Sequence, residues 1–496
     1  MLTIMKRTTV ILAGLLLVIS FGGFLWVNPG RGPREEVNPT NKGWSEEVEG
    51  TLVLHLKGTP YEMGYQRGHF AKDKVLLSAS IFEGLLEQAK KEMGLPKFAA
   101  HLLLDITYQV CAPFIPDRYK REMEGLADAS GCNLKMIRRS HVISVLTERG
   151  CSTFAVWGNA TADGDLYHGR NFDWITTAGL EDTAILTLYE PDGFQKFAVA
   201  GYAGLIGVLS GMNMEGISIS QIGAITQDRS LRGLPLEFVL RRILEECTDL
   251  EEVTTLMQSV KHTVGFNYVV ADGDAHDARA YETTANHIAI FGANDPLETV
   301  EYAIPIEDAV FRSDEAMDPV VRSLQRCANA PNMPYGSNSY DHRYKGAATG
   351  ILNNYGTITS DIALNILKTT AMKNANLHAV LANSTKRELW IAHAANGENA
   401  SLQPFIHYNL NQLFLQPNLR TVVEDFSTPV DAVVTENNDN TVPPEQTVNK
   451  EVEEGKKDVE QPVEEGEQEK NIEKEEEPTP EKKEVTVKEG EPVIEP

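Results

Sequence analysis

The sequence predicts an α+β domain between a hydrophobic N-terminal segment and an acidic C-terminal tail. Three observations support this. Apolar residues recur at helical spacing before Cys151, β-prone runs alternate with helices after it, and neither pattern reaches the two ends of the chain. With 496 residues, the chain is long enough for two or three domains and a large buried core.

The first 27 residues form an apolar segment with a basic start. Lys6 and Arg7 precede Thr8–Val27, a run of 20 residues without a charge. Such a helix matches the thickness of a bilayer, and the basic flank places the N-terminus in the cytoplasm. The bulky run Phe24–Val27 offers no small-residue cleavage site, which favours an uncleaved signal anchor over a removed signal peptide. We therefore expect a membrane attachment, a linker over residues 28–50, and a protein on the extracellular face of the cell membrane or secreted.

The negative charge is concentrated in the tail. The chain has 45 basic and 71 acidic residues, a net charge of -26, and residues 429–496 alone hold 22 acidic and 8 basic residues, a net charge of -14. This part contains no Phe, Trp or Tyr, so residues 428–496 are predicted to be a disordered spacer or a tail that binds a partner or cation. The overall charge argues against nucleic acid as a ligand.

Residues 51–150 are predicted to be a mainly helical region. Apolar residues recur at helical spacing in two stretches: Leu77, Ile81, Leu85 and Ala89, and Tyr119, Met123 and Leu126 before Gly131.

Residues 151–427 are predicted to form the catalytic domain. The expected strands are residues 184–189, 197–202, 216–222, 267–271 and 287–291. Helices are expected over residues 235–247 and 249–259, and Thr248 and Glu251 have capping-box spacing at the start of the second.

The cysteines do not form a metal or disulfide pattern. The chain has five, Cys111, Cys132, Cys151, Cys247 and Cys327, without a C-x-x-C pair, and no H-E-x-x-H helix is present. The sequence therefore predicts neither a metal site nor a cofactor, and an odd number of cysteines leaves at least one thiol unpaired.

Cys151 has a distinctive setting. It follows Gly150 and opens a β-prone run to residue 157; a turn-rich stretch leads to a second run over residues 166–174. A hairpin would bring Arg170 and Asp173 beside Cys151. Without further signals, a cysteine in a strand is more often a small core residue than a nucleophile.

Two motifs carry a family resemblance. Gly150-Cys151-Ser152, followed by Gly-Arg-Asn-Phe-Asp-Trp at residues 169–174, resembles the N-terminal-nucleophile hydrolases of the choloylglycine hydrolase and acid ceramidase group. Within that group, the sequence is most similar to the autoproteolytic acyltransferase family typified by isopenicillin N acyltransferase (acyl-coenzyme A:6-aminopenicillanate acyltransferase). Residues 58–68, GTPYEMGYQRG, resemble the pro-region motif of this family. The resemblance extends from about Leu52 to Leu415, and it implies a four-layer αββα sandwich.

The resemblance also implies a mechanism. The precursor would cleave its own Gly150–Cys151 bond into an alpha chain, residues 51–150, and a beta chain that begins at Cys151. The freed α-amino group would then be the general base for the thiol of the same residue, because its pKa of about 8 suits it to take up the thiol proton. Glycine suits the cleavage because it permits a strained backbone.

The other site residues are carried over from the motifs. Asp173 is expected to accept hydrogen bonds from the new ammonium group, and Arg170 to favour the thiolate. Since residues three apart on a strand point to opposite faces, both reach the nucleophile only across a bend or bulge. Asn267 is expected to stabilise the oxyanion, whereas the place of a second donor holds Gln221.

A late arginine of the family is expected to bind substrate. Arg312 is the best match, with Arg279, Arg322 and Arg343 as alternatives.

Together these features predict a self-processing cysteine amidohydrolase or acyltransferase that acts on a small acyl amide. Water or an amine can resolve the acyl thioester, and the expected extracellular location favours hydrolysis. Two alternatives remain. One is a lipid amidase or lysophospholipase-like hydrolase, whose mark would be an apolar pocket. The other is a non-catalytic surface-anchored protein on the same scaffold.

Overall fold

A computed structural model describes residues 31–93, 96–146, 150–224, 226–300, 302–325 and 341–415. The predicted signal anchor at residues 1–27, the predicted tail at residues 428–496 and Cys327 lie outside these ranges. Within them, none of the helices combines the length and hydropathy that crossing a bilayer requires.

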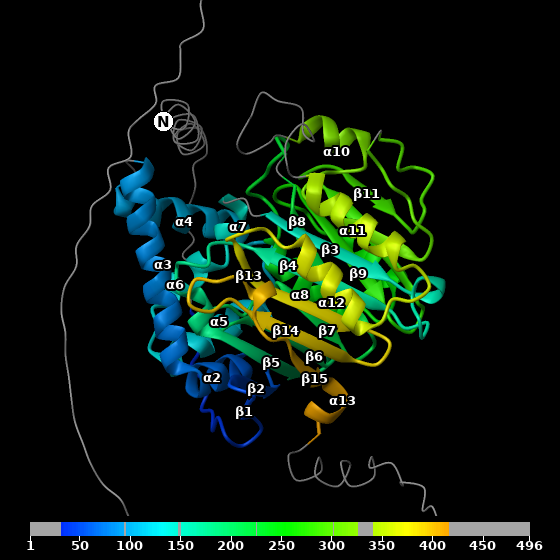
Figure 1. Cartoon of the computed structure of the whole chain (residues 1–496). Coiled ribbons are helices and arrows are strands. Elements are labelled where there is room, and N and C mark those ends of the chain that lie inside the picture. Colours follow the sequence, from blue (N-terminus) through cyan, green and yellow to red (C-terminus); the bar gives the residue numbers. More distant parts are fainter. Residues whose placement is uncertain are drawn as a thin grey trace, which may run out of the picture. The chain divides into compact units, whose positions relative to one another are not determined.

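Two sheets form the centre of the fold (Figure 1). The larger has nine strands in the order β1-β2-β5-β6-β7-β8-β9-β10-β11. Its strands are β1 (Trp44–Val48), β2 (Thr51–Gly58), β5 (Ala184–Pro191), β6 (Phe197–Tyr202), β7 (Ser210–Asn213), β8 (Ile217–Gly223), β9 (Phe266–Asp272), β10 (Asp277–Thr283) and β11 (Ile288–Phe291). The five strands predicted from the sequence are therefore present, with small shifts at their ends.

The second sheet has six strands in the order β12-β3-β4-β13-β14-β15. These are β3 (Gly150–Val156), β4 (Tyr167–Asp173), β12 (Ala309–Arg312), β13 (Asn376–Asn383), β14 (Glu388–His393) and β15 (Ile406–Asn409). The predicted hairpin on either side of residues 158–165 is thus confirmed, and it forms β3 and β4 inside this sheet.

Helices cover the outer face of each sheet, which gives four layers (Figure 1). Eight of the described helices share the apolar core of the nine-stranded sheet: α2 (Pro60–Phe70), α3 (Lys72–Met93), α4 (Lys97–Cys111), α5 (Asp117–Ser130), α6 (Leu134–Ser140), α7 (Ile143–Leu146), α8 (Leu236–Glu246) and α9 (Leu250–Ser259). Of these, α2, α8 and α9 pack directly on its strands. On the six-stranded sheet lie α11 (Asp341–Asn353) and α12 (Ser360–Thr370). The remaining short helices are α10 (Pro319–Leu324) and α13 (Leu410–Leu413).

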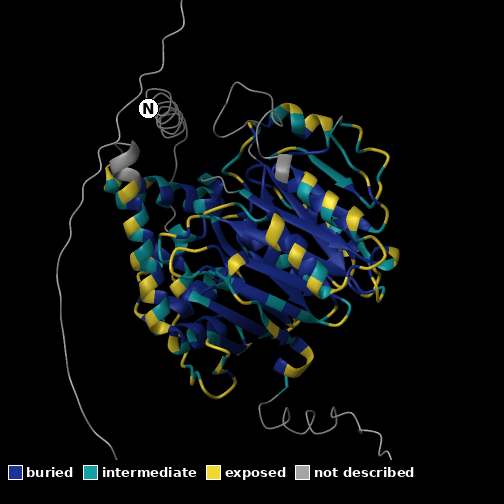
Figure 2. Cartoon of the chain, viewed as in Figure 1, coloured by how far each residue is buried: buried dark blue, intermediate teal, exposed yellow. Residues whose placement is uncertain are grey.

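The core follows this layering. Leu186 and Ala198 of the larger sheet pack against Val380 and Ile391 of the smaller one, so the sheets meet through apolar side chains. Figure 2 shows the strands buried, with exposed residues mainly on the outer helices and loops. The αββα arrangement agrees with the expectation from the sequence.

The region before Cys151 is more than a helical pro-region. Trp44–Val48, inside the predicted linker, forms β1, and the ring of Trp44 stacks on His55 of β2 with their centroids 4.1 Å apart. Strand β2 then pairs in parallel with β5. Chain segments from both sides of the Gly150–Cys151 bond are therefore hydrogen-bonded in one sheet.

The motif at residues 58–68 begins α2 and packs this helix closely against α5. Thr59 and Glu62 form a capping box at the start of α2. A Cβ atom on Gly64 would lie 2.0 Å from the carbonyl oxygen of Glu122 in α5, so the two helices touch through their backbones. The buried Arg67 donates hydrogen bonds to the carbonyl oxygen of Leu205 at 2.6 Å and the hydroxyl of Tyr189 at 2.7 Å.

We expect Gly64→Ala to lower the free energy of unfolding by about 3 kcal/mol, because the added methyl must push α2 away from the backbone of α5. Gly84→Ala is the matched control: Gly84 is exposed on α3, and no atom lies within 4 Å of the place that a methyl group would take there. This change is therefore neutral or stabilises by up to about 1 kcal/mol. Chemical denaturation of both variants checks the difference. Equal losses would contradict the close helix contact.

The start of α9 corrects one prediction. The N-cap is Asp249, whose side chain accepts a hydrogen bond from the Glu252 amide at 2.8 Å. Thr248 instead donates its amide and hydroxyl to the Glu252 carboxylate. The capping pair is therefore shifted by one residue from Thr248 and Glu251, because the carboxylate of Asp249 reaches the first turn.

Candidate active site

Cys151 lies at the start of β3, which is the second strand from one edge of the six-stranded sheet. It pairs with Phe172 of β4, and Gly150 pairs with Asp173. Paired residues share a face of the sheet, so the thiol points toward the space between the two sheets, whereas Asp173 points toward the helices. Cys151 has no exposed surface.

On the inner face, Arg170 approaches the thiol. Its Nη2 atom lies 3.6 Å from Sγ of Cys151 and 3.3 Å from the carbonyl oxygen of Gln221. Its Nη1 atom donates to Ser210 at 2.7 Å and contacts Nε2 of His378 at 2.9 Å. The hydrogen bonds described for Arg170 thus go to neutral groups and to the thiol, which leaves its positive charge directed at Cys151.

His378 fixes this arginine. Burial and the charge of Arg170 hold the pKa of His378 well below its ordinary value, so the ring is neutral. Because an arginine only donates, Nε2 must be the acceptor, and the proton sits on Nδ1, 2.9 Å from the hydroxyl of Tyr202. Neither His378 nor Tyr202 was predicted from the sequence.

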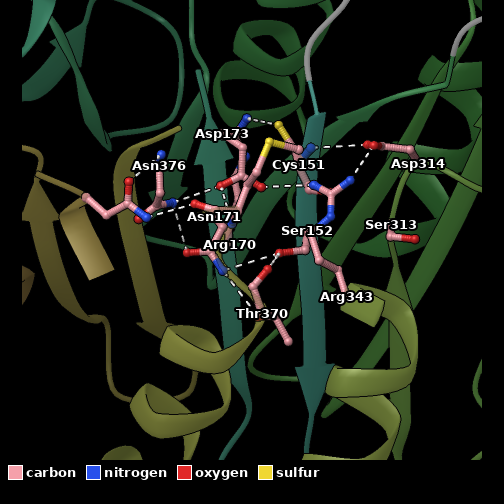
Figure 3. Close-up of polar contacts among 12 residues, drawn as sticks. Cys151, Ser152, Arg170, Asn171, Asp173, Ser313, Asp314, Arg343, Thr370 and Asn376 are labelled. Atoms are coloured by element: carbon pink, nitrogen blue, oxygen red, sulfur yellow. Dashed lines mark hydrogen bonds and ion pairs between the residues drawn. The ribbon is translucent and has the colours of Figure 1, made fainter. Parts of the chain in front are cut away.

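On the outer face, a buried arginine joins two carboxylates (Figure 3). Nη1 of Arg343 lies 2.9 Å from Oδ2 of Asp173 and 3.0 Å from the carbonyl oxygen of Cys151, and its Nη2 pairs with Asp314. Asp314 also accepts a hydrogen bond from the backbone nitrogen of Cys151 at 3.1 Å. The backbone of the nucleophile is therefore held by Arg343 and Asp314.

The substrate-binding role of Arg312 stays a prediction, and the contacts of Arg312 in the structure are with other residues of the fold. Arg312 lies on β12 and forms ion pairs with Glu282 and Glu298, so its charge is already compensated within the fold. Arg343, one of the alternatives that the sequence left open, is the late arginine that reaches Cys151. Arg279 and Arg322 make other contacts: Arg279 pairs with Glu251, and Arg322 lies over the ring of Tyr302.

Asn267 is near the site but is engaged with backbone. Its Nδ2 atom donates to the carbonyl oxygens of Ser313 at 3.0 Å and Glu315 at 3.1 Å, so the amide positions the segment that carries Asp314. Its oxyanion role stays a prediction. Gln221 is buried on β8 beside Arg170, and within the described residues its Oε1 atom has no hydrogen-bond partner.

Burial dominates the electrostatics of the site. It raises the pKa of the Cys151 thiol to about 11, although Arg170 acts in the opposite direction. It also raises the pKa of Asp173 to about 6, against the charge of Arg343. In the intact chain the thiol is thus protonated at neutral pH and needs a base to react.

The space around Gly150 is limited by two side chains. It does not have a positive φ, so the expected backbone strain is not observed there. A Cβ atom at this position would lie 2.9 Å from Cε of Met372 and 3.3 Å from Nη1 of Arg343. A side chain at residue 150 would therefore disturb the arginine that binds the Cys151 carbonyl.

An apolar pocket lies beside the nucleophile. Its empty volume is about 680 Å³, including space open to solvent, and α3, α6 and the segments after β4 and β6 form it. Four of its lining residues also pack in the cluster around Cys151: Phe172, Leu180, Tyr202 and Leu209. The pocket thus joins residues from before and after the Gly150–Cys151 bond.

Across the described ranges, no group of three or more His, Cys, Asp or Glu side chains is arranged to hold a metal ion. Cys111, Cys132, Cys151 and Cys247 are buried free thiols.

Comparison with known families gives one family match. Residues 160–302 match the model of the acyl-coenzyme A:6-aminopenicillanic acid acyl-transferase family. This range includes Arg170, Asp173 and Asn267, and it begins after Cys151.

Curated relatives match in sequence over about half of the chain. Protein dcd1B of Dictyostelium discoideum is 27% identical over 283 residues, which cover 52% of this chain and 55% of the relative. Protein dcd1A of the same organism is 25% identical, with 54% and 67% covered. The 40 kDa form of the acyl-coenzyme A:6-aminopenicillanic-acid-acyltransferase of Emericella nidulans is 28% identical, with 46% and 63% covered. These matches confirm the resemblance to the acyltransferase family.

Solved structures also match about half of this chain. The Caenorhabditis elegans ortholog of N-acylethanolamine-hydrolyzing acid amidase has 15% identity and a TM-score of 0.36, and the match covers 47% of this chain and 93% of that one. Penicillin V acylase from Agrobacterium tumefaciens has 10% identity and a TM-score of 0.34, with 53% and 86% covered.

Proposed function

We propose that the chain is a self-processing cysteine amidohydrolase or acyltransferase that acts on a small acyl amide through a thioester on Cys151. The observation that carries this proposal is the setting of Cys151: Arg170 lies at its thiol, Asp314 at its nitrogen and Arg343 at its carbonyl. The sequence relation to an acyltransferase family supports an enzyme of this kind.

Self-cleavage would use the thiol of Cys151 on the preceding peptide bond. The sulfur adds to the carbonyl carbon of Gly150, the bond to the Cys151 nitrogen breaks, and the thiol proton ends on that nitrogen. Water then hydrolyses the thioester, which leaves a carboxylate on Gly150 and a free thiol and amine on Cys151. The absence of a side chain at Gly150 leaves room for this addition.

Turnover would repeat the same chemistry on a bound amide. The thiol gives its proton to the α-amino group as sulfur adds to the substrate carbonyl, and the resulting ammonium gives the proton to the leaving amine. Arg170 stabilises the negative charge on sulfur. Water or an amine then releases the acyl group from the thioester.

Mass analysis of the purified protein together with N-terminal sequencing tests the proposal. We expect two fragments, the second beginning at Cys151. A panel of acyl p-nitroanilides from acetyl to palmitoyl then tests amide hydrolysis. An intact chain without activity on the whole panel would favour the alternative of a non-catalytic protein on this scaffold.

A lipid amidase is a second candidate, and the apolar pocket favours it. The lining is dominated by residues such as Val75, Phe82 and Leu209, which suit an acyl chain better than a polar group. This candidate differs from the first only in the length of the acyl group that the site accepts.

Ala79→Trp is expected to shift the preference to shorter acyl groups, because Ala79 lines the pocket and an indole would fill part of it. We expect kcat/KM for palmitoyl p-nitroanilide to fall at least about 10-fold relative to the acetyl compound. Ser80→Trp, on the exposed side of the same helix, is the control and should leave the ratio unchanged. An unchanged ratio in Ala79→Trp would show that acyl chains bind elsewhere.

We further propose that residues 1–27 export the domain and hold it at the extracellular face of the membrane. The apolar run of Thr8–Val27 behind Lys6 and Arg7 supports this location. Deletion of residues 1–27 should leave the protein in the cytoplasmic fraction of its host, and an unchanged distribution would contradict the proposal.

A further inference from the structure

Asp314 is the carboxylate that meets the nitrogen of the nucleophile. Its Oδ1 atom lies 3.1 Å from the backbone nitrogen of Cys151 (Figure 3). Its Oδ2 atom pairs with Arg343. Asp314 is 5% exposed, so this contact lies inside the protein rather than at its surface.

The backbone around Asp314 is held at three successive carbonyl groups, each of which accepts a hydrogen bond from a side-chain amide. Asn267 donates to the carbonyls of Ser313 and Glu315, and Nε2 of Gln325 donates to the carbonyl of Asp314 itself at 2.9 Å. These buried amides come from different parts of the chain. A segment held in this way presents its carboxylate at one defined position.

Asp173, which the sequence motif assigns to the amino group, is engaged elsewhere. Its Oδ2 atom accepts from Arg343 at 2.9 Å, and its Oδ1 atom accepts from Asn376 at 3.0 Å and from the Met372 amide at 3.2 Å. Its side chain therefore reaches the site through Arg343.

We propose that Asp314 binds the α-amino group of Cys151 after self-cleavage, and that Asp173 is a positioning residue that acts through Arg343. The assignment rests on the proposed function, because only cleavage converts this backbone nitrogen into an amine. The existing amide hydrogen bond then becomes a charge-assisted one whenever the amine carries the proton taken from the thiol. Asp314 holds that ammonium until the proton passes to the leaving amine.

The charges around the amine determine its response to pH. Asp314 and Asp173 favour the ammonium form, whereas Arg343 on α11 and Arg170 on β4 oppose it. Asp314 is the carboxylate in contact, so its loss should lower the pKa of the amine. The general base must be unprotonated to act, and the acidic limb of the rate profile therefore moves to lower pH.

The test compares Asp314→Asn with wild type on the acyl p-nitroanilide that wild type hydrolyses fastest. In the cleaved fraction of the variant, the acidic limb of kcat/KM should lie about 1 pH unit lower, and the plateau rate should fall about 10-fold. Asp314→Glu keeps the charge and should retain the wild-type limb. Glu282→Gln, which removes a buried carboxylate that pairs with Arg312, is the matched control and should also retain it.

The outcomes separate this assignment from the proposed function. A lower plateau with an unmoved acidic limb in Asp314→Asn would overturn the role of Asp314 while the enzyme proposal stands. If Asp314→Asn does not cleave itself, Asp314→Glu provides the test. An acidic limb of kcat/KM about 1 pH unit below that of wild type in Asp314→Glu would also overturn the role of Asp314. Wild-type protein that is neither cleaved nor active would refute the proposed function and this assignment together.

Discussion

Cys151→Ala is expected to remain a single polypeptide and to lose activity on acyl p-nitroanilides by at least about 1,000-fold. The thiol is the only group of residue 151 that can attack the Gly150 carbonyl, and without cleavage no α-amine forms. Both steps therefore fail together. Intact mass measurement and p-nitroaniline release check the two losses separately.

Cys247→Ala is the matched control for this result. Cys247 is also a buried free thiol, and it lies at the end of α8. Its replacement should leave the cleavage site and the activity unchanged, apart from a modest loss of stability. Cleavage before residue 151 in the Cys151→Ala protein would show that another group performs the attack.

The hairpin around Cys151 could be predicted because its signals are local. β-prone runs flank a turn-rich stretch, and the strands formed within one residue of the expected positions. The same pattern correctly indicated that Arg170 and Asp173 would point to opposite faces. In the structure no bend brings them together, and Arg343 links Asp173 to the nucleophile instead.

Local sequence patterns could not single out Arg343 and Asp314, the two outer-face residues that hold the backbone of Cys151. Arg343 lies 192 positions after Cys151, and nothing in its local sequence distinguishes it from Arg312. The difference is that Arg312 finds two glutamates in the fold, whereas Arg343 finds Asp173 and Asp314. Arg343 lies next to Cys151 because α11 packs against β3, which is a contact between distant parts of the chain.

The extent of the region before Cys151 was underestimated for a similar reason. Thr51–Gly58 contains the alternating Leu52, Leu54 and Leu56, a signal for a strand. Its parallel pairing with β5, however, is a contact between distant segments that local patterns do not indicate. A cut at Gly150 would therefore leave two chains that share one sheet.

Arg343→Met is expected to abolish self-cleavage and to lower the free energy of unfolding by about 3–5 kcal/mol. The change leaves Asp173 and Asp314 buried without their shared cation and frees the carbonyl of Cys151. Chemical denaturation and intact mass measurement give the two effects.

Arg312→Met is the control that distinguishes a loss of stability from a loss of self-cleavage. This arginine is equally buried and pairs with Glu282 and Glu298, so its loss should cost a similar free energy while the Gly150–Cys151 bond is still cut. Cleavage in Arg343→Met, or equal loss of cleavage in both variants, would contradict a specific role for Arg343.

The stability deficit of Arg343→Met should also depend on pH. Burial already raises the pKa of Asp173 to about 6 with the arginine in place, and removing the cation raises it further. An acid whose pKa is higher in the folded than in the unfolded chain stabilises the fold at low pH and loses that contribution as the pH rises through the folded pKa. The deficit relative to wild type should therefore be smaller at about pH 5 than at about pH 8. A deficit that is larger at the lower pH would mean that Asp173 and Asp314 do not depend on Arg343 for their charge.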